Sequence, residues 1–447
     1  MEITKTIKLR IQNYTNIFAE TLEIYRSALS FIVDVVDNKW DDISSLSTKE
    51  QVNAVEKLIH KTSYNPSPKY GFDDAFYKYP SYLRRATIAE AIGIVSSYRA
   101  NYQNWLDKKV KVEAKGKKFN DKTPTLQTKC FSFPVFYKTN MFQHLTDNQA
   151  LIKVFYNNDW QWLTVTYDPK NLNNRNLDEY REQNPSLVKK GKKYFLHIPY
   201  VTNKKLNQTP VEEQTIVAVD LGLTNSAVCS AMRIDGTVTG RLFINQPVEK
   251  DRLYTKLNKI AKANRDSGIG RKPNLWRKVN GLSKQIVQDT VNQIVNFALE
   301  YNASVIVFEH LGKFKTQTRG ATRLRQKLQF WCKQRIQHRT KHKAHTQGIR
   351  FSRVVAKNTS KLAFDGSGEV TRSKQGDMCT FSTGKQYHTD LSASYNIGSR
   401  YFIREILKTL SETTRLQLEA KVPSIASRTC CTLASLISLN KALSFTG

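Results

Sequence analysis

The sequence predicts a multidomain protein of mixed α+β and α/β class, in which a small β-barrel with a helical insert precedes an α/β domain. Three observations lead to this prediction. The chain has 447 residues, which is longer than one ordinary domain. Strand-type alternation occurs on both sides of a long block with helical spacing. From residue 215 onward, apolar strand-like segments alternate with long helical segments, which is typical of an α/β domain.

A predicted strand and a helical block open the chain. Apolar and polar residues alternate over residues 1–12, as in a strand with one buried face. Apolar residues then recur every three or four positions, and Ser47 with Glu50 forms a capping box at the start of one helix. Another helix is expected from about 80 to 106, and a basic polar loop is expected over 109–126.

Four further strand patterns complete the predicted barrel. They are separated by turn residues and read CFSFPVFY, ALIKVFY, WQWLTVTY and KKYFLHIPY. We expect the first strand (1–13) and the later strands (127–201) to form one barrel, with the helical domain (14–126) inserted between them. Residues 202–214 are then a linker.

The predicted α/β domain covers residues 215–402 and leaves 403–447 as a tail without a clear pattern. Its first strand carries Asp220, and Asp235-Gly236 marks a hairpin between the next two strands. Long helical regions separate two later strands, SVIVFEH and FSRVVA. The segment TDLSASYNIGSRYFIREIL then predicts a helix that begins near Asp390.

The composition indicates a polyanionic partner. The chain contains 70 Lys and Arg against 38 Asp and Glu, a net charge of +32, and such an excess repels itself unless a polyanion neutralises it. The 20 Tyr, 21 Phe and 6 Trp are interleaved with the basic residues, which suits stacking on nucleic-acid bases. No run of eighteen apolar residues and no signal-peptide core occurs. We therefore expect an intracellular, cytoplasmic protein that binds nucleic acid and no membrane, with its six Cys as reduced thiols.

Three carboxylates stand at the ends of predicted core elements: Asp220, Glu309 and Asp390. Any one of them alone is best interpreted as a helix cap or as the partner of an Arg. Together they indicate a metal site, because parallel strands bring their carboxyl ends to one crevice. Mg²⁺ prefers hard oxygen ligands, and two ions about 3.5–4 Å apart can activate a water and stabilise the leaving oxygen in phosphodiester cleavage.

The blocks around these acids resemble the three motifs of a RuvC-type nuclease of the RNase H-like fold. They read IVAVDLGLTNSAV, VIVFEHLGKF and DLSASYNIG. The layout as a whole resembles TnpB, the transposon-encoded RNA-guided nuclease, and the compact type V CRISPR effectors, although the N-terminal half matches by architecture only. The resemblance implies that Asp220, Glu309 and Asp390 are the catalytic, metal-binding acids. It also implies that the barrel is the wedge-like, oligonucleotide-binding-like barrel of that family.

This resemblance implies an RNA-guided DNA endonuclease of the TnpB type with a single RuvC site. The expected partners are a guide RNA, with one protein chain per guide, and target double-stranded DNA next to a short flanking motif. The expected cofactors are two Mg²⁺ or Mn²⁺ ions, in a prokaryotic, nucleoid-associated protein. A compact type V CRISPR effector is the near alternative. An RNA-guided repressor without cleavage is a further one, but it should have lost an acid, and all three are present.

A zinc ribbon with two C-x-x-C pairs is usual in this family between the second and third acids, and this chain lacks its thiols. Ala363 and Gly366 stand where the first pair is expected, and Cys379 is left with Ser382 in the partner position. One thiol cannot form a four-ligand zinc site. We therefore expect a degenerate ribbon near 357–389 without zinc.

Several basic segments are expected to contact nucleic acid. No Asp or Glu occurs between Glu309 and Asp365, and a basic run next to a phosphodiesterase acid suits the guidance of a strand. The loop after the long helix and the segment RDSGIGRKPNLWRK suit backbone contact with a heteroduplex. The candidate contact residues are Arg84, Arg85, Lys115, Lys117, Lys118, Arg271, Lys272, Trp276, Arg277, Lys278, Arg319, Arg323, Arg325 and Lys327.

Overall fold

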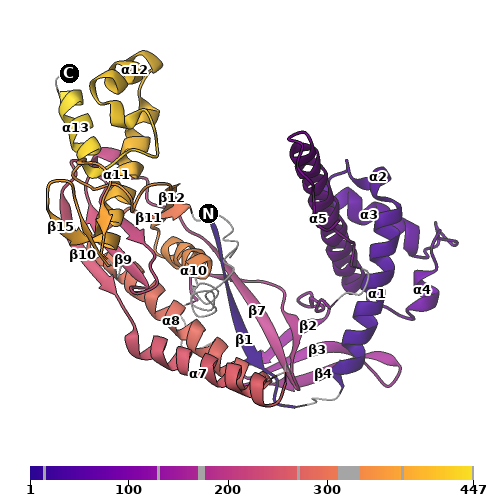
Figure 1. Ribbon diagram of the computed structural model, residues 1–447. Coiled ribbons are helices and arrows are strands. Elements are labelled where there is room, and N and C mark those ends of the chain that lie inside the picture. Colours follow the sequence, from indigo (N-terminus) through magenta and orange to yellow (C-terminus); the bar gives the residue numbers. More distant parts are fainter. Residues whose placement is uncertain are drawn as a thin grey trace. The chain divides into compact units, whose positions relative to one another are not determined.

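The computed structural model describes residues 1–13, 17–127, 131–169, 177–268, 272–310, 333–373 and 377–444. The chain divides into two compact units (Figure 1). The N-terminal unit is Glu2–Thr202, and the C-terminal unit is Asn203–Gly447 together with Met1. None of the helices in these ranges is both long and apolar enough to cross a bilayer.

The helices of the N-terminal unit pack on one apolar core. They are α1 (Phe18–Asn38), α2 (Trp40–Ile43), α3 (Thr48–Ile59), α4 (Phe72–Ala75) and α5 (Ser81–Glu113), which is the longest of those described. The residues predicted at helical spacing on α1, such as Leu29 and Ile32, are fully buried. The capping box is also confirmed, because the backbone N–H and the hydroxyl of Ser47 donate to Glu50 at 3.0 and 2.7 Å.

Helix α5 is longer than the sequence pattern predicted. The loop expected from residue 109 begins only after Glu113. Residues 109–113 contain no Gly or Pro, and the stop signal is Gly116, whose φ of 65° is left-handed. An ion pair from Lys108 to Asp121 and a hydrogen bond from the Trp105 indole to the Asp121 carbonyl hold the returning chain against the helix.

The single barrel is not found in the described part of the chain. Strand β7 (Lys193–Asn203) pairs with β1 (Glu2–Arg10), β5 (Arg181–Glu182) and β6 (Ser186–Lys190). Strands β2 (Phe142–Thr146), β3 (Gln149–Tyr156) and β4 (Asp159–Thr166) form a separate sheet. One isolated bridge joins Ile11 to Tyr167 beyond the ends of β1 and β4.

The expected strand CFSFPVFY is the reason that the barrel prediction fails. Over residues 131–137 it forms a single bridge, Val135 to Ser186, in place of a ladder. Pro134 lacks the N–H that a central strand would donate. The two sheets still share one apolar core with α1 and α5, so the barrel's elements are present without its closure.

The C-terminal unit is built on a mixed five-stranded sheet in the order β10-β9-β8-β11-β12. The strands are β8 (Ile216–Asp220), β9 (Ala227–Met232), β10 (Val238–Ile244), β11 (Val305–His310) and β12 (Arg350–Val355). Strand β11 runs parallel to both β8 and β12, whereas β9 is antiparallel to β8 and β10. The predicted hairpin at Asp235-Gly236 is confirmed, with a φ of 90° at Gly236.

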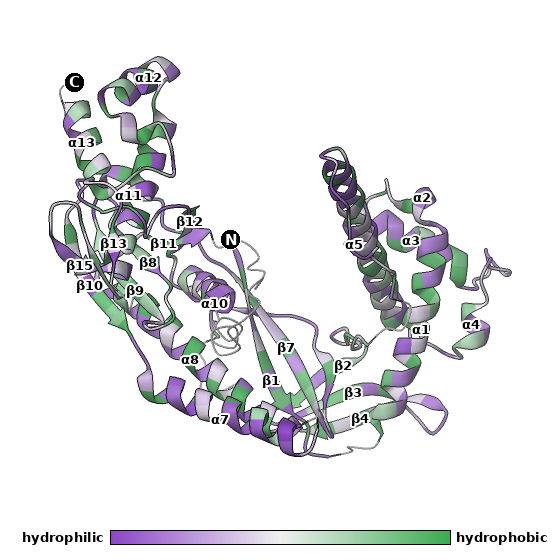
Figure 2. Cartoon of the chain, in the orientation of Figure 1, coloured by the Kyte–Doolittle hydropathy of each residue, from purple (hydrophilic) through white to green (hydrophobic). Residues whose placement is uncertain are grey.

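Helices cover both faces of this sheet, which explains the apolar run that leads to Asp220. The helices are α7 (Pro247–Asp266), α8 (Pro273–Glu300), α10 (Lys333–Thr346), α11 (Thr389–Thr409), α12 (Glu412–Lys421) and α13 (Leu433–Ser444). On β8, Val217 and Val219 join the core with α8 and α10, and Ile216 and Ala218 join the core with α11. Figure 2 shows that the central strands are apolar, whereas α7 is more hydrophilic.

Arg400 holds the segment before α13 to the sheet. Its guanidinium donates to the carbonyls of Cys431 and Thr429 at 3.1 and 2.9 Å, and to those of Val355 and Lys357 at 2.7 Å each. Helix α11 itself continues to Thr409, and α12 and α13 pack in the same core as α11. The segment without a clear sequence pattern is therefore folded onto the α/β unit.

The segment between the second and third acids contains a small sheet with its own core. Strands β13 (Thr371–Arg372), β14 (Met378–Thr380) and β15 (Gln386–His388) pair in that order. Ala363, Cys379 and Phe381 are buried together, and Phe364, Val370 and Tyr387 pack against them. The Cys379 thiol donates to the carbonyl of Tyr387 at 3.3 Å.

This packing predicts different effects for two substitutions. Phe381→Ala should loosen residues 359–389, since removal of a buried Phe ring costs about 3–5 kcal/mol. Cys379→Ser should change little, because a hydroxyl can still donate to the Tyr387 carbonyl. Limited proteolysis and hydrogen exchange over this segment measure both effects, and elemental analysis should find less than one zinc per chain. One zinc per chain, lost together with the fold on Cys379→Ser, would contradict the interpretation.

Candidate functional site

Asp220 and Glu309 stand at the carboxyl ends of two neighbouring parallel strands. Val219 of β8 pairs with Phe308 of β11, so the two acids follow at adjacent positions at the same edge of the sheet. Asp220 is 8% exposed and Glu309 is half-buried. The sheet thus places these two predicted site residues side by side.

Asp390 reaches the same region from the first turn of α11. A carboxylate there is favoured by the helix dipole, and the Asn225 side chain forms a hydrogen bond to it. Gly222 leaves the space for this approach, because a Cβ at that position would lie 2.9 Å from Asp390 Oδ2 and 2.8 Å from the Asn225 carbonyl oxygen. The turn after Asp220 therefore helps to fix the third acid.

The three carboxylates interact electrostatically in a setting that disfavours their charge. Burial raises the pKa of Asp220 well above its usual range, and the charges of Glu309 and Asp390 raise it further. Burial also raises the pKa of Glu309 and of Asp390. Hydrogen bonds from Thr359 to Glu309 and from Asn225 to Asp390 oppose these shifts.

This donor set suits hard divalent cations. Carboxylate oxygens are the ligands that Mg²⁺ and Mn²⁺ prefer, and a cation would offset the repulsion among the three acids. No group of three or more His, Cys, Asp or Glu within the described ranges is drawn together tightly enough to hold an ion as it stands. Asp220, Glu309 and Asp390 are the residues whose carboxylate oxygens could ligate such a cation.

Four polar residues around the acids were missed by the sequence analysis as parts of the site. The Thr359 hydroxyl donates to Glu309, and the Asn396 amide donates to the carbonyls of Thr359 and Leu362 at 2.9 Å each. Lys250 Nζ donates to the carbonyls of Leu223 and Thr224 in the turn after Asp220, at 3.2 and 2.5 Å. The positive charge of Arg372 acts on Asp220 and Asp390.

A weak sequence signal existed for two of these four residues. Thr359 and Asn396 fall in segments that the family resemblance had matched without a role. Lys250 and Arg372 lie among many basic residues, and nothing in their spacing distinguishes them.

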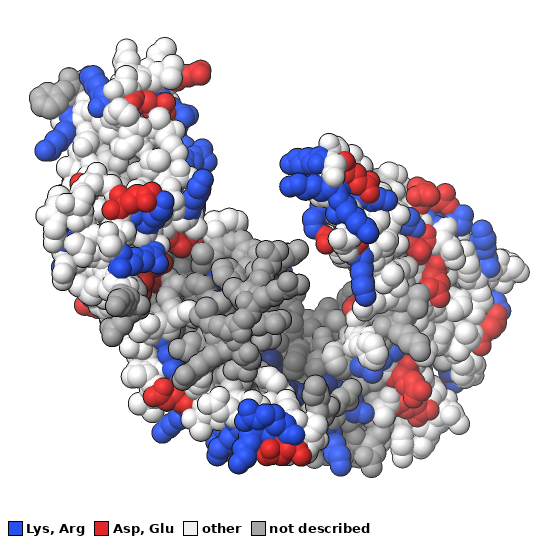
Figure 3. All heavy atoms as spheres, in the orientation of Figure 1, with Lys and Arg blue, Asp and Glu red and all other residues white. Residues whose placement is uncertain are grey.

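The predicted nucleic-acid contacts fall into three groups. Arg85, Lys115, Lys117, Lys118, Trp276, Arg277 and Lys278 are exposed, and Lys272 is half-buried. Figure 3 shows that Lys and Arg gather at one end of α5. Arg84 is buried and donates to Glu56 at 3.2–3.3 Å, so it ties α5 to α3 and does not face solvent. The remaining predicted contacts lie outside the described residues: Arg271, Arg319, Arg323, Arg325 and Lys327.

The raised pKa of Asp220 predicts that neutralising it stabilises the metal-free protein. A buried acid with a raised pKa removes stability as the pH rises through that pKa. Ionisation then leaves a negative carboxylate in surroundings that disfavour its charge. In EDTA, Asp220→Asn should raise the melting temperature at pH 7, by about 2–4 °C for each kcal/mol recovered. The gain should shrink as the pH falls toward and below 4, because the carboxyl then becomes protonated in the unfolded state as well.

The matched control is Asp266→Asn, which changes an exposed acid at the end of α7 and should leave the melting temperature unchanged at both pH values. Differential scanning calorimetry in EDTA measures the effect. An Asp220→Asn protein that melts below the wild type at pH 7 would contradict the account.

The chain is similar to several known proteins over part of its length. A model described as the Aq_aa04 family matches residues 4–156. The TnpB-like protein aq_aa05 of Aquifex aeolicus (strain VF5) is 23% identical over 232 residues, which cover 47% of this chain and 74% of that protein. The uncharacterized protein aq_aa04 of the same organism is 27% identical over 143 residues, covering 31% of this chain and 76% of that protein.

Two solved structures are also similar at low identity. The Cas12f1–sgRNA–target DNA complex has a chain that is 13% identical with a TM-score of 0.42, covering 81% of this chain and 91% of that one. CasPhi-2 (Cas12j) bound to crRNA is 12% identical with a TM-score of 0.45, covering 89% of this chain and 98% of that one. The resemblance to TnpB that the three sequence motifs indicate is confirmed by the match to the TnpB-like protein.

Proposed function

We propose that this protein is an RNA-guided DNA endonuclease of the TnpB type, with one catalytic site formed by Asp220, Glu309 and Asp390. The observation that carries the proposal is the placement of Asp220 and Glu309 at the same edge of the mixed sheet, with Asp390 of α11 near enough for its charge to act on Asp220. The sequence similarity to a TnpB-like protein supports it independently. A structural role alone would not require three acids that repel one another at the ends of core elements.

The three acids would hold two Mg²⁺ or Mn²⁺ ions, which when bound supply an activated water and stabilise the leaving oxygen of a phosphodiester. The surrounding residues prepare the ligands. Thr359 fixes the orientation of Glu309 by donating a hydrogen bond to it, and Asn225 does the same for Asp390. Such hydrogen bonds orient metal ligands and determine how they meet the ion.

The proposed partners are inferred from the net charge of the chain and from its similarity to a TnpB-like protein. A net charge of +32 and the exposed basic groups on α5 and α8 suit a guide RNA and a DNA target held through their phosphates. A compact type V CRISPR effector is the alternative, and the neighbouring genome separates the two origins through transposon ends or a repeat array. A repressor without cleavage is disfavoured, because all three acids are retained.

Removal of one acid should separate cleavage from binding. Asp220→Ala or Glu309→Ala should reduce target cleavage by at least about 10³-fold, since each removes a metal ligand, while RNA and target binding stay within about twofold because they rest on basic surfaces. Asp266→Ala is the control and should cleave normally. A guided cleavage assay with and without EDTA measures activity, and a mobility-shift assay measures binding. Normal cutting by the Asp220→Ala protein would refute the site.

The guided mechanism predicts a co-purifying RNA. Protein purified gently at low salt should carry a discrete non-coding RNA, identifiable by sequencing. The affinity of the protein for this RNA should fall steeply as the salt concentration rises. The slope of log K against log salt should steepen by about 0.7 to 0.9 for each phosphate contacted. Absence of any discrete RNA, or a nearly flat salt response, would count against a guide.

A further inference from the structure

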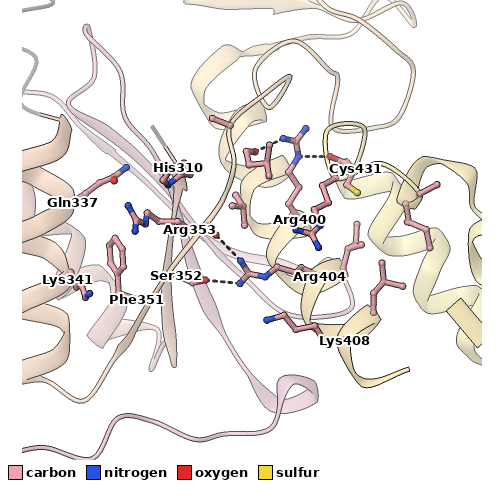
Figure 4. Close-up of a pocket in the computed structure, with 18 of the residues that line it drawn as sticks. His310, Gln337, Lys341, Phe351, Ser352, Arg353, Arg400, Arg404, Lys408 and Cys431 are labelled. Atoms are coloured by element: carbon pink, nitrogen blue, oxygen red, sulfur yellow. Dashed lines mark hydrogen bonds between the residues drawn. The ribbon is translucent and has the colours of Figure 1, made fainter. Parts of the chain in front are cut away.

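A cavity of about 1020 Å³ lies along the outer edge of strand β12. Strand β12 is the last strand of the sheet, so one side of it has no neighbouring strand. Helix α10, helix α11 and the segment after α12 form the remaining walls, all within the C-terminal unit (Figure 4). Asp220, Asp390 and residues 357–389 do not contribute to its lining.

The lining of this cavity is strongly basic. Among the described residues that line it are seven Lys or Arg and two His, and neither Asp nor Glu. The basic residues are His310, His338, Lys341, Arg353, Arg400, Arg404, Lys408, Arg415 and Arg428. A cavity whose described charged side chains are all basic concentrates a positive field, which attracts a polyanion.

Four of the seven Lys or Arg are already engaged inside the protein. Arg400 holds the carbonyls described above, and Arg404 donates to the Arg353 carbonyl and to the Ser352 hydroxyl at 2.8 Å each, as Figure 4 shows. Lys408 and Arg415 pair with Glu405 and Glu419, which lie outside the lining. All four residues form part of the wall, and Arg400 and Arg404 cover carbonyls of β12.

Three cations remain available for a ligand. Lys341, Arg353 and Arg428 have exposed side chains, and none of them takes part in a side-chain hydrogen bond or ion pair within the described ranges. They come from α10, from β12 and from the segment after α12, so they surround the cavity. In Figure 4 the Arg353 side chain extends from β12 toward α10.

The cavity also borders the candidate catalytic edge. His310, which lines it, follows Glu309 directly, and Gln337 of its α10 wall donates to the Glu309 carbonyl at 2.9 Å. The half-buried ring of Phe351 lines the same cavity and offers an apolar surface for a base. Cations with an adjacent aromatic ring are the combination that binds single strands.

We propose that this cavity binds a single strand of nucleic acid, with Lys341, Arg353 and Arg428 contacting its phosphates. A cavity of this volume lies at the upper end of the ~300–1,000 Å³ range of ligand pockets, which suits a few nucleotides of one strand and excludes a duplex. The strand would lie beside Glu309 without touching the three acids. The proposal goes beyond cleavage and does not depend on it, because binding requires no metal.

The test measures binding of short oligo(dT) and oligo(U) of equal length in EDTA by fluorescence anisotropy. The variant Lys341→Ala/Arg353→Ala/Arg428→Ala should weaken binding of at least one oligonucleotide tenfold or more and lower the slope of log K against log salt by about 2, since each lost phosphate contact removes about 0.7. The preferred oligonucleotide identifies whether DNA or RNA is the ligand.

The matched control removes the same charge elsewhere. Arg252, Lys259 and Lys262 are exposed on α7, so Arg252→Ala/Lys259→Ala/Lys262→Ala should weaken binding less than threefold. Equal losses in the two triple variants, or unchanged binding of both oligonucleotides by the cavity variant, would overturn the proposal. Should the cavity variant fold poorly by circular dichroism, Arg353→Gln replaces it, because this exposed side chain has no internal partner in the described chain.

Photocrosslinking of the wild type locates the strand directly. Oligonucleotides that carry 5-iodouracil should crosslink to peptides that contain β12 or α10. Crosslinks confined to other peptides would overturn the proposal even if the cavity variant bound weakly. Because no step involves cleavage, these results and those of the nuclease assay can fail separately.

Discussion

The repulsion among three carboxylates that have lost part of their hydration is the constraint on which the rest of the C-terminal unit depends. Asp220, Glu309 and Asp390 each lose hydration, and their charges oppose one another. Only rigid elements can hold such groups together in the absence of a cation. Strand β8 is buried on both faces, and Gly398 lets α11 approach the sheet closely, since a Cβ there would lie 2.5 Å from Met232 Sδ and 3.3 Å from Ala218 Cβ. Core packing thus stabilises the acids' positions against their mutual repulsion.

Arg400 joins several parts of the unit that would otherwise be independent. It is 4% exposed, and its N–H groups go to carbonyls after β12 and in the segment before α13. Its positive charge also acts on Glu309. Four of the five guanidinium N–H groups donate to backbone oxygens, so Arg400 adds positive charge near Glu309 while these bonds hold it to the backbone. The folded C-terminal segment therefore contributes to the electrostatics of the site.

The sequence predicted individual helices and strands better than it predicted whether the strands close into a barrel. The apolar run before Asp220 and the hairpin at Asp235-Gly236 follow from local patterns, and both were predicted correctly. The barrel failed because Pro134 interrupts one strand, and α5 extended because its stop signal lies later, at Gly116. The role of Thr359 and the position of Lys250 could not be derived from sequence patterns, since the partners of both residues are set by long-range packing. Local periodicity carries no information about which distant carbonyl or carboxylate a polar side chain meets.

Aromatic packing stabilises the small sheet between Glu309 and Asp390 and connects it to α11. The aromatic cluster of Phe364, Phe381 and Tyr387 continues onto α11, where the rings of Phe364 and Tyr395 lie 5.2 Å apart and the hydroxyls of Tyr387 and Tyr395 are 3.0 Å apart. Tyr395 follows Asp390 by little more than one helical turn. Aromatic pairs add about 0.5–1.5 kcal/mol each beyond the area that they bury. Rings packed against α11 can therefore hold this small sheet beside Asp390 through hydrophobic contact.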